Sequence, residues 1–161
     1  MNVTNKLAIL LTLFLTLGIT TVAAVTEDGS SINPEFTQDS VSPSYTLQVD
    51  YSGFTGSSPA QDHIVVHMPS EIESSVDSDD ITVDSPSSNV DYSLTNYDDD
   101  GEKEIYIYAS DGNFPNSFNL EVDIEATSPG SEGSYVFNVN PYDDGNSGEE
   151  TSLTTHVDDT A

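Results

Sequence analysis

FNLEVDIEA, residues 118–126, alternates apolar and polar side chains without a break. Successive side chains of a β-strand point to opposite faces of the sheet, so one face of this segment is wholly apolar and the other wholly polar. The helical period of 3.6 residues does not fit this pattern. We therefore predict a strand that covers a hydrophobic core with one face and meets solvent with the other.

The same alternation recurs in other parts of the chain, which gives eight predicted strands in all. Between them lie segments rich in Gly, Pro, Asp, Asn and Ser, the residues that form turns. Short strands at this spacing predict an all-β fold, an antiparallel sandwich or barrel, in one domain. The other seven predicted strands are residues 45–51, 64–68, 81–83, 90–94, 105–107, 135–139 and 153–157.

The N-terminal segment has a different composition. Lys6 precedes an uncharged stretch over residues 7–25, the arrangement of an export signal. Small residues at its end predict cleavage after Ala24, so residues 1–24 are interpreted as a signal peptide. An uncleaved anchor is the alternative, because the stretch just reaches the length that spans a bilayer. In both cases the rest of the chain is extracellular, and it begins with a predicted flexible linker over residues 25–35.

The chain is strongly acidic, with 29 Asp and Glu against 2 Lys and Arg and a net charge of −27. Nucleic-acid binding is excluded by the shortage of cations, and disulfides and thiolate metal sites by the absence of cysteine. Beyond residue 25 the only Lys or Arg is Lys103. This composition resembles that of proteins from halophilic archaea, in which a Debye length of about 3 Å at molar salt removes self-repulsion.

Three segments resemble a known family in type and order: HIVVHMPSEI at 63–72, SDDITVDS at 78–85 and FNLEVDIEATSPGSEGSYVFNV at 118–139. They are similar to immunoglobulin-like domains of prokaryotic surface-layer and other cell-surface proteins. The resemblance implies a single Ig-like β-sandwich over residues 36–159 and a role as a stalk, spacer or adhesive module. Its motifs mark the fold and not a function; they include Pro69, Pro129, Gly133 and Tyr135.

Two acidic turns are candidate cation sites. The first has oxygen-bearing residues and a glycine at the first, third, fifth and sixth positions of a calcium loop, which are Asn96, Asp98, Asp100 and Gly101. Its twelfth position is Ile107 where a Glu is needed, so an Asp-Gly hairpin turn is the alternative. The second turn has Asp143 and Asp144 before Gly145. We expect the two turns at opposite ends of the sandwich, and we assign no metal ligand.

The histidines and serines predict no catalytic site. His63 and His67 point to the same side of one strand, but about 13 Å separates them, too far for one metal. His156 has no partner that the sequence reveals. No GxSxG motif and no Ser-His-Asp arrangement can be placed on the predicted strands. We therefore expect no enzyme activity and no cofactor.

Tyr106 and Tyr108 fall on the predicted outward side of a strand. They are candidates for stacking on a glycan or docking a cell-surface protein, and cross-strand packing is the alternative. Two functional hypotheses follow. The favoured one is a secreted or membrane-tethered structural or adhesion module of a halophile's cell surface, without catalysis. The alternative is an extracellular accessory protein whose acidic turns bind calcium or magnesium.

Overall fold

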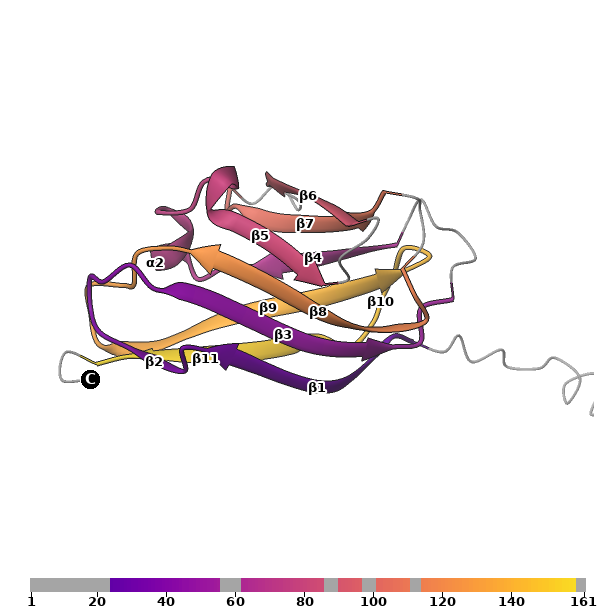
Figure 1. Ribbon diagram of the computed structural model, residues 1–161, viewed down its shortest axis with the longest axis horizontal. Coiled ribbons are helices and arrows are strands. Elements are labelled where there is room, and N and C mark those ends of the chain that lie inside the picture. Colours follow the sequence, from indigo (N-terminus) through magenta and orange to yellow (C-terminus); the bar gives the residue numbers. More distant parts are fainter. Residues whose placement is uncertain (1–23, 56–61, 86–89, 97–100, 111–113, 159–161) are drawn as a thin grey trace, which may run out of the picture.

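The computed structural model describes residues 24–55, 62–85, 90–96, 101–110 and 114–158, and it has two β-sheets packed face to face (Figure 1). The smaller sheet has four strands. In their order across the sheet these are β1 (Thr26–Asn33), β3 (Ser44–Ser52), β8 (Ser117–Glu125) and β5 (Ile81–Ser85).

The larger sheet has seven strands, of which the short β10 pairs only with β9. The path across it runs β2 (Phe36–Thr37), β11 (Thr151–Val157), β9 (Gly133–Asp143), β4 (His63–His67), β7 (Glu104–Ala109) and β6 (Val90–Thr95), with β10 (Asn146–Ser147) at the end of β9. All eight predicted segments are strands, and the predicted all-β sandwich is confirmed. Pairing is antiparallel except between β2 and β11, which run parallel.

The predicted flexible linker over residues 25–35 is wrong. Thr26–Asn33 forms β1, which pairs along β3 at the edge of the smaller sheet. Val25 before it is fully buried, and its carbonyl accepts a hydrogen bond from the Glu149 N–H at 2.9 Å. The segment holds little apolar sequence, so backbone pairing with β3 orders it where no hydrophobic period announces a strand. The sandwich therefore begins at residue 25.

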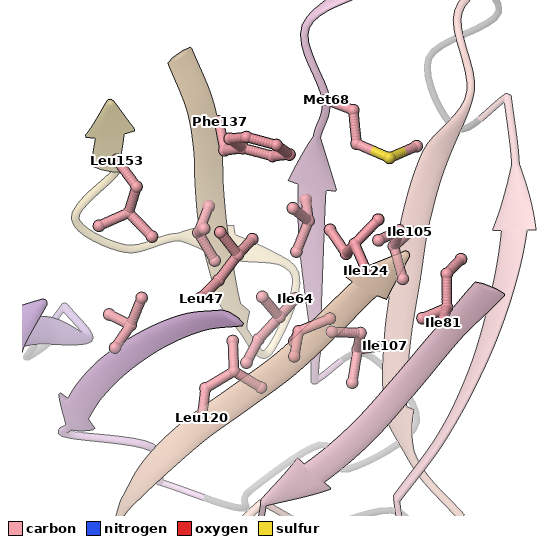
Figure 2. Close-up of a cluster of buried hydrophobic side chains, with 14 of the residues drawn as sticks. Leu47, Ile64, Met68, Ile81, Ile105, Ile107, Leu120, Ile124, Phe137 and Leu153 are labelled. Atoms are coloured by element: carbon pink, nitrogen blue, oxygen red, sulfur yellow. The ribbon is translucent and has the colours of Figure 1, made fainter. Parts of the chain in front are cut away.

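The core lies between the two sheets (Figure 2). Leu120, Val122 and Ile124 of β8 are fully buried, as their alternation predicts, and they face side chains of the larger sheet such as Ile64 and Ile107. Fully burying an aliphatic side chain stabilises a fold by about 1.5–3 kcal/mol. The two-residue period of β8 is thus the main sequence signal for the packing of the domain.

Two single-turn helices occupy the connection from β4 to β5: α2 (Ser70–Glu73) and a 3-10 turn (Ser78–Asp80). Pro69 precedes α2, where its fixed φ and missing N–H suit a helix start, and Ile72 fixes the turn to the core by being fully buried. No helix in the described ranges is long and apolar enough to cross a membrane. The predicted signal over residues 1–24 lies outside those ranges except at its last residue.

Candidate functional site

The outer face of the larger sheet carries four rings that we call the aromatic patch: His63 on β4, Tyr106 and Tyr108 on β7, and Tyr142 on β9. The register places His63 directly opposite Tyr108 on one side and Tyr142 on the other. The His63 ring stacks on Tyr142 with centroids 4.5 Å apart and lies 4.9 Å from the Tyr106 ring. Tyr106 and Tyr108 are 5.7 Å apart. The patch therefore crosses three neighbouring strands without a gap.

Val65 lies beneath the aromatic patch. Ile64 and Val66 belong to the core between the sheets, so Val65 points outward, yet it is 0% exposed. Tyr106 stands directly opposite it on β7. An apolar side chain buried on the solvent face means that its neighbours form a small apolar layer outside the sandwich.

The two tyrosines of β7 lie on the outer face, where the sequence predicts them. Both are half-buried. Burial, and secondly the charge of Tyr108, raise the pKa of the Tyr106 hydroxyl. The Tyr106 ring also packs across the strands against the His63 ring, which is one of the two roles that the sequence suggests for it.

A cluster of three carboxylates lies at the end of the sheet next to the aromatic patch. We call Asp62, Asp143 and Asp144 the Asp62 cluster; one oxygen of each lies within 4.8 Å of the others. Asp62 precedes β4 and Asp143 ends the neighbouring antiparallel strand β9, so both arrive at the same edge. Asp62 is 3% exposed and Asp143 is 4% exposed.

The turn after β9 places the third carboxylate. Asp144 and Gly145 have φ of 52° and 77°, and Asp143 pairs with Asn146, which defines a two-residue hairpin turn with positive φ at both central positions. Asp and Gly suit these positions because they tolerate left-handed backbone. The turn directs the Asp144 N–H to Asp62, whose Oδ1 accepts it at 2.9 Å.

Thr55, the last residue of the described range 24–55, forms hydrogen bonds with the Asp62 cluster. Its N–H donates to Oδ1 of Asp143 at 3.0 Å, and its hydroxyl donates to Oδ2 of the same carboxylate at 2.9 Å. Burial raises the pKa of Asp62, the negative charges of Asp143 and Asp144 add to the rise, and the hydrogen bond from the Asp144 N–H opposes it. The cluster thus gathers negative charge in a place with little access to water.

The other predicted candidates lie elsewhere. Asp98 and Asp100 of the first acidic turn fall outside the described residues, and Ile107, at its twelfth position, is fully buried in the core. Thr95 and Glu104, the paired residues on either side of that segment, lie at the end of the sheet opposite Asp143.

The other two histidines have separate environments. Nδ1 of His67 lies 3.9 Å from Oε1 of Glu104, which is fully buried. His156, for which the sequence revealed no partner, stacks on Phe36 and shares a 2.9 Å hydrogen bond with the Ser134 hydroxyl. The three predicted histidines are therefore not brought together.

A second acidic group lies on the smaller sheet. Asp84, Glu121 and Asp123 also bring carboxylate oxygens within 4.8 Å of one another, but they are exposed or half-buried. Glu121 accepts a hydrogen bond from Nε2 of Gln48 at 2.6 Å, and Asp123 accepts one from the Thr46 hydroxyl. Cross-strand partners and solvent thus account for this group.

No family model and no curated protein matches the chain. Solved structures share its fold, and one is the cohesin module of a family 33 glycoside hydrolase from Clostridium perfringens. That module is 14% identical with a TM-score of 0.51, over 86% of this chain and 98% of that chain. At this identity the likeness shows the fold alone, an Ig-like β-sandwich.

Two further solved structures are similar. The major pilin subunit BcpA of Bacillus cereus is 11% identical with a TM-score of 0.48, over 83% of this chain and 39% of that chain. The C-terminal domain of the antigen I/II-family protein AspA of Streptococcus pyogenes is 12% identical with a TM-score of 0.44, over 84% of this chain and 53% of that chain.

Proposed function

We propose that the protein is a non-catalytic binding module of a halophile's cell surface, secreted or tethered through its N-terminal segment, and that it docks a partner protein on the aromatic patch. The aromatic patch is the observation that carries this proposal. Tyrosine is enriched at protein interfaces because its ring is large and rigid and its hydroxyl remains polar. The stacking within the patch holds its rings in place before a partner arrives, which lowers the entropy cost of binding.

Three of the four edge strands of the described sheets are poor sites for the addition of another strand. In the smaller sheet both edge strands carry a register shift, in β1 between Glu27 and Gly29 and in β5 between Val83 and Ser85. In the larger sheet one edge strand, β2, is only two residues long, whereas the other, β6, has six residues and no register shift. Bulges and very short edge strands hinder the addition of a strand from another chain. By this criterion β6 is the one edge among the described strands that stays available, and we place the contact on the outer face because the aromatic rings lie there.

The charge supports the halophile assignment. All 29 acidic residues lie beyond residue 25, with Lys103 as the only Lys or Arg there. Molar salt shortens the Debye length to about 3 Å and so removes the repulsion between exposed carboxylates. Under the same conditions long-range attraction is lost, and contact between rings becomes the main source of affinity.

Binding to isolated cell envelopes of the source organism in about 3 M salt tests the proposal. We expect the protein to sediment with envelopes, and we expect the double variant Tyr106→Ser/Tyr108→Ser to lose most of this binding. The matched control is Phe36→Ser, because Phe36 is 60% exposed on β2, away from the aromatic patch. It should bind like the unaltered protein.

Pretreatment of the envelopes distinguishes a protein partner from a glycan. A protein partner predicts that protease treatment removes the binding sites and that periodate, which oxidises sugars, leaves them. Loss with periodate alone would mean that the patch stacks on a glycan instead. Equal binding by the double variant and the control would show that the patch is only cross-strand packing.

A further inference from the structure

We propose that the Asp62 cluster binds one calcium ion at the end of the sandwich. The inference rests on the positions of three carboxylates, on the burial of two of them and on one buried oxygen without a hydrogen-bond partner among the described residues. It goes beyond the docking surface, and it concerns a different set of side chains. It assigns no role to the first acidic turn at residues 96–101.

The spacing of the three carboxylates fits one ion. Calcium binds oxygen at about 2.3–2.6 Å, so two oxygens on opposite sides of it are about 4.8 Å apart, and other pairs are closer. One oxygen from each of Asp62, Asp143 and Asp144 lies within this limit of the others. A single calcium ion can therefore touch all three side chains.

One oxygen of Asp62 points to a missing ligand. Oδ1 accepts the Asp144 N–H, whereas Oδ2 is fully buried and has no hydrogen-bond partner in the described part of the chain. Leaving a buried carboxylate oxygen without a partner is costly, and the cost is larger for a charged group. The second acidic group, around Asp84, differs in this respect because it is more exposed and its carboxylates have cross-strand partners.

The Lys103 side chain is too far from the Asp62 cluster to neutralise its negative charge. Lys103 is the only Lys or Arg beyond residue 25, and its Nζ donates to the Val76 carbonyl at 3.0 Å. It precedes β7 at the end that pairs with His67, whereas Asp62 adjoins the end that pairs with Tyr108. The strand between them is about 17 Å long, beyond the Debye length even at moderate salt.

The donor chemistry selects the ion. All three side chains offer only carboxylate oxygen, which suits hard cations better than zinc, whose protein sites include His or Cys ligands in addition to any carboxylate. Calcium accepts irregular geometry and sheds its water readily, whereas magnesium needs near-octahedral geometry and keeps several waters. Since Asp62 and Asp143 leave little room for retained water, calcium fits the site better.

A bound ion would stabilise the region next to the aromatic patch. It would link Asp62, at the start of β4, to the β9–β10 turn, and Thr55 already donates to Asp143 from the other side. His63 directly follows Asp62 in the chain, and Tyr142 directly precedes Asp143. These two rings are the stacked pair of the aromatic patch. Calcium is therefore expected to hold these two strands in register at the patch.

The test compares calcium responses of three proteins after chelation, in about 1 M NaCl to screen unspecific attraction. Calorimetric titration of the unaltered protein with CaCl2 should give one site, and the melting temperature should rise with calcium concentration. Asp62→Asn keeps the shape of the side chain and should lose both responses. Without calcium it should melt higher than the unaltered protein, because it removes one buried charge from the cluster.

Asp123→Asn is the matched control, since it removes one charge from the second acidic group and should keep the full calcium response. Asp144→Asn is a second variant at the site and should also lose the response. The proposal is overturned if the unaltered protein shows no calcium-dependent shift, or if Asp62→Asn and Asp123→Asn respond alike. No partner is used, so the outcome is independent of docking on the aromatic patch.

Discussion

The Tyr45 hydroxyl offers a sharp test of the core. Tyr45 is 0% exposed, its ring packs against Phe137 with centroids 5.5 Å apart, and its hydroxyl has no hydrogen-bond partner among the described residues. A buried polar group without a partner costs about 1–3 kcal/mol relative to its solvated state. Tyr45→Phe keeps the ring contact and removes that cost, so we expect it to stabilise the protein.

The size of the effect follows from two opposing contributions. The lost desolvation cost favours the variant, and the small void left by the missing oxygen opposes it, which leaves a net gain of about 1 kcal/mol. For a domain of this length that corresponds to a rise in melting temperature of about 4 °C. Thermal and urea unfolding in high salt, followed by circular dichroism, measure both quantities.

Tyr51→Phe is the matched control. Tyr51 is also buried in the core, but its hydroxyl donates to the Val139 carbonyl at 3.4 Å. Its loss leaves that carbonyl with one partner fewer, so we expect destabilisation by about 0.5–1.5 kcal/mol. The reasoning is refuted if Tyr45→Phe destabilises the protein as much as Tyr51→Phe does, because the Tyr45 hydroxyl would then have a favourable partner.

Three further predictions concern salt, packing and pH. The melting temperature should rise steeply between 0.1 M and about 3 M salt as screening removes carboxylate repulsion, and a flat profile would contradict the halophile assignment. Leu120→Asp should unfold the domain in denaturant titrations, because it buries a charge in the core. Asp123→Asn on the opposite face should cost little in high salt, because its amide oxygen can still accept the hydrogen bond from the Thr46 hydroxyl. Burial raises the pKa of Tyr45 to about 12. Since the folded state favours the neutral hydroxyl, the contribution of Tyr45 to stability should be constant below about pH 10 and be lost between about pH 10 and pH 12. The decrease in stability over this range should therefore be smaller in Tyr45→Phe.

The strands that sequence could predict are those with one buried face. The alternation in residues 118–126 marks β8 because every second side chain enters the core. β1 could not be predicted in this way, since TEDGSSIN contributes only Ile32 to the core and its order comes from pairing with β3. The two-residue strands β2 and β10 are too short to show any period.

Some residues of the candidate sites could be predicted from local sequence, and others depend on strand pairing. The outward position of Tyr106 and the acidic turn at Asp143 follow from local pattern. Asp62 could not be assigned to that turn, because its place depends on β4 lying beside β9, a pairing between segments far apart in the chain. The same pairing brings His63 against Tyr142. Asp62 before β4 and Asp143 at the end of β9 indicate a common site only when it is known that these two strands are neighbours in the sheet.

The burial of Val25 has a consequence for the timing of export. If the predicted cleavage after Ala24 takes place, a peptidase must bind the bond between Ala24 and Val25 in its cleft as an extended segment. Once the domain has folded, Val25 is fully buried and its carbonyl is bonded to Glu149, so the bond is no longer accessible. Such cleavage would therefore have to precede folding. On this hypothesis a chain that folds first would keep its N-terminal segment, and the relative rates of cleavage and folding would set the ratio of released to anchored protein.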